Sequence, residues 1–389
     1  MKTSIGIALT GLMLVILLAA CTVPVTPSPS AGTTPTTVAT VAKPAWQQKW
    51  DGTLAEAKKE GKLTVYTLWG PEVTNPVSQA FKAKYGIEVE FANLGRGSAL
   101  LPKVDTENRA GLYLADAYGF GASTLVTSMK PIGALGPLEP MLILPEVADP
   151  KAWTGDQVPY MDKEKLVIGM LASPQRFISY NTDMIKDGEL AGYKDLVKPQ
   201  YKGKIAMGDP SLTGAPNALF THLGFDLWSA DESIQYLRQL LTQQDAVLSS
   251  DGRQIIEWVA RGKYALGLAG QQQAVAEFVA LGAPINVLIQ KEGHLIDAAG
   301  GALSVPKKMP HPNATVIFVN WLLTKEGETL LAKGYGFPSL LKAASTEGIS
   351  PILLAKPGEK LFPLSEEQLI ARGPAMEAAR KVIQDTRVK

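Results

Sequence analysis

Apolar residues follow two regular spacings along the chain from residue 45 onward. Trp46, Trp50 and Leu54 recur at helical spacing and predict a helix over residues 46–61, and the apolar run 62–69 predicts a strand. The alternation continues with helices over 77–85 and 100–110 and strands over 87–92 and 112–117. This order predicts a doubly wound α/β fold with a parallel sheet, whose ligands bind outside the carboxyl ends of the strands.

The same alternation returns after a Pro- and Leu-rich section, 131–159, that we expect to be irregular. Two apolar runs, 166–172 and 176–181, are predicted as strands that cross between two lobes. The further strands are expected over 204–207, 264–269, 285–289 and 298–306, and the further helices over 233–241, 251–262, 272–281, 313–323, 326–333 and 365–386. The second series of α/β elements indicates a second lobe.

We expect the following division of the chain into lobes. Lobe 1 is assigned to residues 45–172 and 297–345, and lobe 2 to residues 173–296 and 346–389.

A strand, a turn-rich loop and a helix start are predicted within residues 201–220. A helix start carries unpaired backbone N–H groups and the positive end of the helix dipole, so this loop can hold an anionic group. The candidate contacts are Ser211, Thr213, Gly214 and Ala215. The alternative is an ordinary connection in which Thr213 only caps the helix.

Composition and charge exclude several classes of protein. The chain has 389 residues, of which 46% are hydrophobic, as in a folded globular protein. Lys and Arg number 38 against 37 Asp and Glu, so no net field attracts nucleic acid. The three histidines, His222, His294 and His311, are widely separated, and we expect no metal site and no cofactor. Phosphate-loop, dinucleotide and nucleophile-elbow motifs are absent from the sequence.

The first 44 residues read as export and tethering segments. Residues 1–20 combine a charged start with a short apolar run and predict a secretory signal peptide. The run ends in Leu-Ala-Ala before Cys21, the only cysteine, a tetrad that resembles the bacterial lipobox and implies lipidation of Cys21. The alternative is an uncleaved signal anchor with an incidental cysteine. Residues 21–44 are rich in Pro, Thr and Ser and predict a tether.

Several stretches together resemble a known family. They are EGKLTVYT from Glu60, FKAKYGIEV from Phe81, YNTD from Tyr180, YKGKIAMGDPS from Tyr201, HPNA from His311 and FVNWLLTKEG from Phe318. These stretches resemble extracellular solute-binding proteins of family 1, and among them the group of ferric-ion-binding proteins. The resemblance implies a type II periplasmic binding fold, in which two α/β lobes joined by a two-crossing hinge close on a solute.

The resemblance also bears on the solute. In the ferric group a small-residue triplet in the second lobe binds a synergistic anion, and Thr213, Gly214 and Ala215 stand at that place. A pair of adjacent tyrosines holds the iron in that group, whereas Gln272 and Gln273 stand there in this sequence. A neutral amide is a poor ligand for a hard trivalent cation, so this departure from the family pattern argues against iron binding.

Other candidate contacts follow from position. Each has a structural alternative: core packing for Trp69, a simple cap for Ser98, an ion pair with a nearby acid for Arg176, and a solvated helix start for the glutamines. The further candidates at strand ends, helix starts and the presumed hinge are Trp69, Gly97, Ser98, Gly119, Phe120, Arg176, Gln271 and Gln272.

We therefore expect the lipid-anchored, monomeric solute-binding component of an ABC importer, which captures a small anionic organic solute such as a phosphonate, phosphate ester or carboxylate. Its partners would be the solute, a permease and an ATPase, and it would contact the membrane only through the anchor, without binding nucleic acid. The first alternative is a ferric-iron carrier that uses a synergistic anion. Alternatives of another class are an extracytoplasmic enzyme, for which no paired nucleophile and base is visible, and a sensory lipoprotein.

Overall fold

The computed structural model describes residues 43–95, 97–297 and 301–387. One sheet has the strand order β2 (Glu88–Asn93), β1 (Lys62–Thr67), β3 (Ala117–Phe120), β13 (Ala302–Pro306) and β4 (Leu135–Gly136), and β5 (Val167–Gly169) also pairs with β13. Strand β1 is parallel to β2 and β3, whereas β13 is antiparallel to β3, β4 and β5. The parallel arrangement predicted for the first three strands is confirmed, and the antiparallel β13 makes the sheet as a whole mixed.

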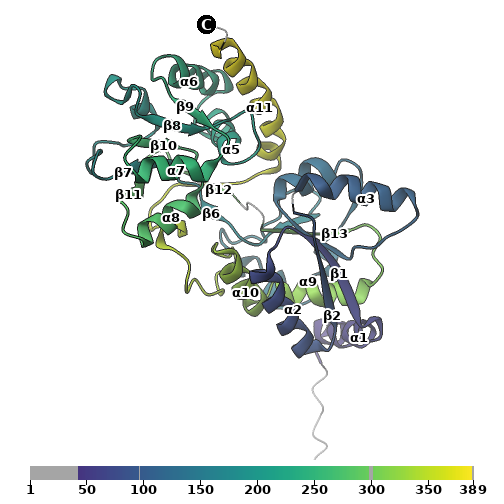
Figure 1. Cartoon of the computed structure of the whole chain (residues 1–389). Coiled ribbons are helices and arrows are strands. Elements are labelled where there is room, and N and C mark those ends of the chain that lie inside the picture. The colour runs from purple at the N-terminus through teal and green to yellow at the C-terminus, as the bar shows by residue number, and fades with distance from the viewer. Residues whose placement is uncertain (1–42, 96, 298–300, 388–389) are drawn as a thin grey trace, which may run out of the picture. The chain divides into compact units, whose positions relative to one another are not determined.

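Helices cover both faces of this first sheet (Figure 1). They are α1 (Ala45–Glu60), α2 (Pro71–Tyr85), α3 (Leu100–Arg109), α4 (Pro145–Ala148), α9 (Pro312–Leu322) and α10 (Lys325–Tyr335). Helix α1 packs against α9, and α2 packs against α10. Trp69, Trp153 and Trp321 are fully buried on this side of the core.

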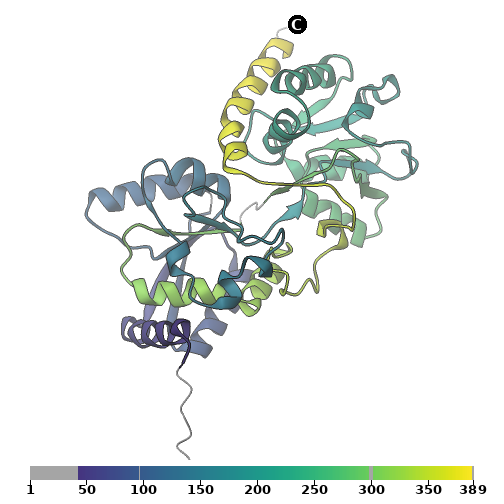
Figure 2. The same ribbon diagram turned by 180° about the vertical axis from the view of Figure 1, so that it is seen from behind.

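The second sheet has the order β11 (Ile285–Val287), β7 (Ile178–Asn181), β10 (Leu266–Leu268), β8 (Ile205–Gly208) and β9 (Val247–Ser249). Strand β8 is parallel to β9 and β10, and β7 is antiparallel to its two neighbours. Its helices are α5 (Ala215–His222), α6 (Ala230–Thr242), α7 (Gly252–Ala260), α8 (Gln272–Ala280) and α11 (Glu366–Arg387). Helix α11 runs beside α5 and α6, as the view from behind shows (Figure 2).

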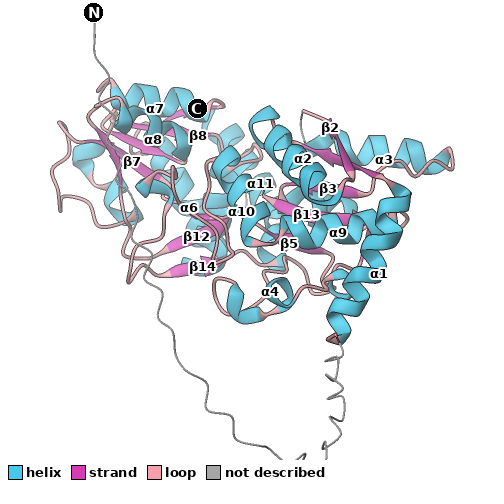
Figure 3. Cartoon of the chain, turned by 90° about the horizontal axis from the view of Figure 1, so that it is seen from below, coloured by secondary structure: helices cyan, strands magenta, loops and turns pink. Residues whose placement is uncertain are grey.

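A third, small sheet contains the chain segments that lead from one large sheet to the other. It consists of β14 (Leu361–Pro363), β12 (His294–Asp297) and β6 (Ser173–Pro174), and β12 lies beside β14 (Figure 3). Strand β6 follows β5, and β12 precedes β13, so both expected crossings pass through this sheet. A further segment carries the chain through β14 into α11. The arrangement is the type II periplasmic binding fold, and the division of the chain at residues 172, 296 and 345 stays a prediction.

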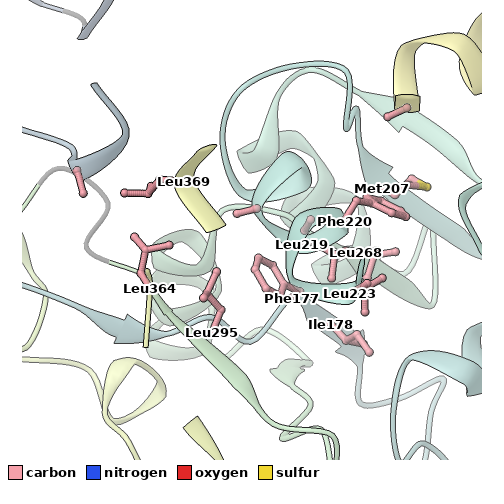
Figure 4. Packing of buried hydrophobic residues seen from close by; sticks show 14 of the residues in the cluster. Phe177, Ile178, Met207, Leu219, Phe220, Leu223, Leu268, Leu295, Leu364 and Leu369 are labelled. Carbon is pink, nitrogen blue, oxygen red and sulfur yellow. The ribbon is translucent and has the colours of Figure 1, made fainter. Parts of the chain in front are cut away.

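The apolar core beside the small sheet joins elements that are far apart in the sequence (Figure 4). Phe177 lies between Leu295 of β12 on one side and Leu219 of α5 and Leu223, the residue after α5, on the other. Leu364 and Leu369 bring the start of α11 into the same cluster. Burial of these side chains therefore fixes α11 next to α5.

The strand pattern was displaced at one place. A strand was expected over 112–117, but the paired residues are Ala117–Phe120, with Ala117 opposite Val65. Leu112 and Leu114 are 49% and 46% exposed and lie in the preceding loop. The apolar run was misleading because these two leucines face solvent, and the glycine after Tyr118 is part of the strand rather than of a loop.

Candidate functional site

The loop between β8 and α5 is shaped by two glycines and one aspartate. A Cβ at Gly208 would lie 2.2 Å from Cγ of Pro216, and Gly214 has φ 126°, which favours glycine. The Asp209 carboxylate accepts hydrogen bonds from the Ser211 backbone N–H at 2.9 Å and from its hydroxyl at 2.6 Å. Ser211 is therefore turned toward Asp209 and stabilises the loop.

Helix α5 begins after Gly214, and its first turn contains a proline. Gly214 is the residue that caps the helix, and no side chain caps it, so the alternative in which Thr213 caps the helix was wrong. The first backbone N–H groups of a helix lack acceptors within the helix. In the first turn of α5, Pro216 is the residue without a backbone N–H. Thr213 is exposed. The loop therefore exposes both the first turn of α5 and the hydroxyl group of Thr213.

This helix start opens into a cavity of about 400 Å³. Loops that follow β3, β8, β9 and β10 contribute most of its lining, together with the end of β12, the second residue after α10 and one residue of α11. The lining residues that bear on the chemistry below are Gly121, Ser123, Asp209, Thr213, Gly214, Ala215, Ser249, Ser250, Gln271, Gln272, Gln273, Asp297, Phe337 and Arg372. The cavity lies at the carboxyl ends of parallel strands, where the doubly wound topology predicts ligand binding.

An arginine on α11 supplies the cavity with a positive charge. Arg372 Nη2 donates to Asp297 Oδ2 at 2.6 Å, and the two side chains are 15% and 10% exposed. The Asn217 side-chain amide donates to the Arg372 carbonyl oxygen at 3.0 Å. Asn217 lies in the first turns of α5, so this bond holds Arg372 beside the helix start.

Five of the candidate residues line this cavity. They are Thr213, Gly214, Ala215, Gln271 and Gln272. Ser211 belongs to the same loop, but its hydroxyl donates to Asp209, and Gly119 and Phe120 belong to β3, two residues and one residue before the lining at Gly121. The role of every one of these residues in binding stays a prediction.

Trp69 is placed in the core by its neighbours. The Trp69 N–H donates to Thr67 Oγ1 at 2.9 Å, and its carbonyl oxygen accepts from Asn93 Nδ2 at 2.8 Å. A Cβ at Gly119 would come within 2.6 Å of the indole ring, which therefore lies flat against β3. Trp69 is 1% exposed and does not line the cavity.

Gly97 and Ser98 form a short turn before α3 and do not line the cavity. A Cβ at Gly97 would lie 2.4 Å from Thr124 Oγ1, so the glycine allows a close approach between two chain segments. Close packing against Thr124 therefore explains the glycine at position 97 without a bound solute.

Arg176 forms the local ion pair that was the alternative to ligand binding. Its Nη2 lies 2.7 Å from Glu359 Oε1, with both side chains at most 4% exposed, and it also donates to the carbonyl oxygens of Ile352 and Leu354. The Arg176 backbone N–H donates to Gln272 Oε1 at 3.0 Å. These bonds connect the segment before β14 to the short segment between β6 and β7.

Gln272 combines a place in the cavity lining with a structural role. Its Nε2 donates to the Pro174 carbonyl oxygen at 3.1 Å, while its Oε1 accepts from Arg176. Both ends of the amide are therefore engaged with the small sheet. At the position where the ferric group has a tyrosine, this chain has a residue that stabilises the hinge.

Two carboxylates, Asp209 and Asp297, are the metal-binding side chains of the described lining. Within the described ranges, the cavity is lined by no tyrosine, histidine or cysteine, and no group of three His, Cys, Asp or Glu side chains is arranged to hold a metal.

Sequence reasoning missed several contributors to the cavity wall. Asp297, Phe337 and Arg372 come from segments in which no motif marks them, and Ser249 ends β9, a strand that was not predicted. Pairing of Asp297 with Arg372 is visible only in three dimensions.

The family model of bacterial extracellular solute-binding proteins matches residues 77–354 of the sequence. The chain therefore belongs to this family. It is the extracytoplasmic solute-binding component of an ABC importer, which delivers a small molecule to a membrane permease. Among the described residues, no helix combines the length and apolar character needed to span a bilayer.

Named relatives carry different ligands. The spermidine/putrescine-binding periplasmic protein 1 of Haemophilus influenzae is 24% identical over 291 residues, which are 73% of this chain and 77% of the relative. The periplasmic binding protein AfuA of Actinobacillus pleuropneumoniae, with fructose-6-phosphate bound, has a TM-score of 0.62 at 21% identity and covers 85% of this chain and 100% of its own. The Trichodesmium protein IdiA (FutA), with iron and citrate, has a TM-score of 0.67 at 18% identity and covers 83% and 99%.

Proposed function

We propose that the cavity binds a small anionic organic solute, such as a phosphonate, a phosphate ester or a carboxylate. The observation that carries this proposal is the meeting of the Arg372 guanidinium with the first turn of α5 in one cavity. Backbone N–H groups at a helix start and a guanidinium both donate hydrogen bonds to phosphate and carboxylate oxygens. Thr213 adds a hydroxyl at the same place.

The size and lining of the cavity support a compact organic molecule. A volume of about 400 Å³ is in the range of sites for small solutes. The hydroxyls of Ser249 and Ser250 and the amides of Gln271 and Gln273 can bond to polar groups of the solute, and Phe337 gives an apolar surface. AfuA, which resembles this chain in fold, holds a sugar phosphate.

Ferric iron fits this lining poorly. The tyrosine pair expected from the resemblance is replaced by Gln272 and Gln273, and Gln272 is already bonded to Arg176 and Pro174. Asp209 and Asp297 are the acidic residues among the described lining residues, and each accepts a hydrogen bond from a neighbouring side chain. Two such carboxylates do not form the oxygen-rich site that a trivalent cation requires.

We also propose that the protein acts by binding alone, as a lipid-anchored monomer. The described lining holds no histidine, cysteine or lysine to pair with Ser249 or Thr213 as a nucleophile and base. Cys21, the signal peptide over residues 1–20 and the tether over 21–44 as far as residue 42 lie outside the described residues, and their sequence supports lipidation at Cys21.

Thermal unfolding of the purified protein with a panel of solutes tests the proposed solute class. Fructose-6-phosphate, ethylphosphonate, a small carboxylate, ferric citrate and putrescine are added separately. We expect at least one organic anion to raise the melting temperature, since a ligand that binds only the native state stabilises it. Stabilisation by ferric citrate with a visible charge-transfer band, or by putrescine alone, would contradict the proposal.

Arg372→Ala provides the matching variant test. We expect it to abolish the shift produced by the anion, while Arg380→Ala, an arginine on the same helix that pairs with Glu377, leaves the shift unchanged. An anion shift that persists in Arg372→Ala would exclude Arg372 as the contact.

A further inference from the structure

We infer that the solute is a zwitterion, a small molecule in which an anionic group is joined to an ammonium group. The inference rests on the proposed function and names the solute class more narrowly. Three charged side chains are found among the described lining residues, namely Asp209, Asp297 and Arg372. Two carboxylates against one guanidinium leave an excess of negative charge, which a purely anionic solute would increase.

The guanidinium of Arg372 is already paired when the cavity is empty. It donates to Asp297 at 2.6 Å, and Asp297 as a residue is 7% exposed. A solute anion that accepts hydrogen bonds from Arg372 weakens the ion pair between Arg372 and Asp297. The negative charge of Asp297 is then less well balanced. A carboxylate that is buried with too little compensation is costly, so a plain anion loses part of the affinity that it gains from Arg372 and the helix start.

An ammonium group on the same solute removes this conflict. It can donate up to three hydrogen bonds and brings the positive charge that Asp297 loses. The anionic end of the solute then lies at the first turn of α5 beside Arg372, and the cationic end at the carboxylates. Binding leaves each charge in the cavity with an opposite charge next to it.

Asp209 offers a second acceptor close to the same helix start. Among the described residues, both hydrogen bonds that it accepts come from Ser211 and reach the same oxygen, Oδ1. A carboxylate has about four acceptor positions, so Asp209 can still accept from an ammonium group. Because Asp209 lies on the loop that leads to Gly214, this acceptor and the anion contact belong to one short segment.

Isothermal titration of the purified protein with three matched probes tests this inference. The probes are 2-aminoethylphosphonate, ethylphosphonate and ethylamine, which carry both groups, only the anion and only the ammonium. We expect 2-aminoethylphosphonate to bind at least tenfold more tightly than ethylphosphonate, and ethylamine not to bind measurably. Beta-alanine and propionate repeat the comparison for carboxylates.

Two variants locate the ammonium contact. Asp297→Asn and Asp209→Asn should each reduce the advantage of the zwitterion over the plain anion, while Asp183→Asn, an exposed aspartate outside the cavity, should keep it. Circular dichroism verifies that each variant is folded. If Asp297→Asn does not fold, Asp209→Asn and the probe comparison on the unchanged protein still decide the question.

The outcomes separate this inference from the proposed function. Equal affinity for the zwitterion and the plain anion overturns the zwitterion and leaves the anion site standing. An amine that binds as tightly as the zwitterion overturns the inference. Failure of both the zwitterions and the plain anions to bind overturns the inference and the proposed solute class together.

Discussion

The carboxyl ends of the strands serve different purposes in the two large sheets. At the first sheet, Trp69 fills the space beside Gly119, and Asn93 bonds to the Trp69 backbone, so the protein's own side chains pack the ends of β1 and β2, while the loop after β3 lines the cavity. At the second sheet, small residues such as Gly208 and Gly214 leave room, and the loops line a cavity. Similar α/β topology therefore yields packing or binding according to the size of a few residues.

A third region, the small sheet, lies between these two in the chain and is rich in buried polar groups. Arg176, Glu359, His294 and Gln272 are bonded to one another or to backbone carbonyl oxygens there. Gln272 also lines the cavity, but the bonds of these four groups are made within the protein, and we expect changes to them to affect stability. The predictions below separate the three regions, from the largest expected effect to the smallest.

Trp69→Ala tests whether the residues at the carboxyl end of the first sheet belong to the protein core. Removing a fully buried indole should lower the free energy of unfolding by about 4 kcal/mol, because of lost burial and the cavity that remains. Urea unfolding measures this, with Trp46→Ala, a tryptophan that is 39% exposed, as the control. A loss of solute affinity with unchanged stability would instead make Trp69 a ligand contact.

Glu359→Ala tests the ion pair of the small sheet. It leaves the buried Arg176 guanidinium without its carboxylate, and we expect a loss of about 3 kcal/mol in the free energy of unfolding. Glu367→Ala removes a carboxylate from an exposed pair with Lys163 and should cost little. Similar losses in the free energy of unfolding for the two variants would show that the buried ion pair contributes no more to stability than the exposed one.

The pH dependence of stability tests His294. Burial lowers the pKa of His294 to about 4, and the nearby charges of Arg176 and His222 act in the same direction. In the unfolded chain the group titrates near 6.5, so the stability it contributes is complete above pH 6.5 and declines as the pH falls toward 4. Between pH 7 and 5 we expect a loss of about 2 kcal/mol.

The variant His294→Gln isolates this contribution. Urea unfolding at several pH values should show a weaker decline for the variant than for the unchanged protein over the same interval. Parallel declines in the two proteins would assign the acid sensitivity to other groups.

Thr213→Ala tests whether the second sheet end is available to a solute. Thr213 is exposed and caps nothing, so stability should change by less than about 0.5 kcal/mol. Affinity for the anionic solute should fall about tenfold, as expected for loss of one hydrogen bond to a charged group. Thr127→Ala, an exposed threonine on another segment, is the control for calorimetry. Unchanged affinity would remove Thr213 from the site.

Local patterns were enough to predict most elements and part of the cavity. The helical spacing from Trp46 marked α1, and the strand, turn and helix around Thr213 placed that residue in the cavity. Such features depend on neighbours within a few residues, which a single sequence displays. The same holds for Pro216, which lies in the first turn of α5 as its position suggested.

Features that depend on distant contacts could not be predicted in this way. Arg372 lies 75 positions after Asp297, and no local signal connects them. The role of Trp69 depends on the absence of a side chain at Gly119, and that of Arg176 on a carboxylate 183 positions away. An aromatic or an arginine near a strand end suits binding and packing equally, and only the tertiary fold decides between them.

The position of Arg372 on α11 has a consequence for the order in which the protein is made. Every strand of the three sheets precedes Arg372 in the chain, so ribosomal synthesis and export deliver the guanidinium after the rest of the cavity wall. A chain that ends short of α11 would present both large sheets but no positive charge at the helix start. If Arg372 binds the solute as we propose, the solute protects only molecules that carry α11, and incomplete chains stay open to proteolysis even where the solute is abundant.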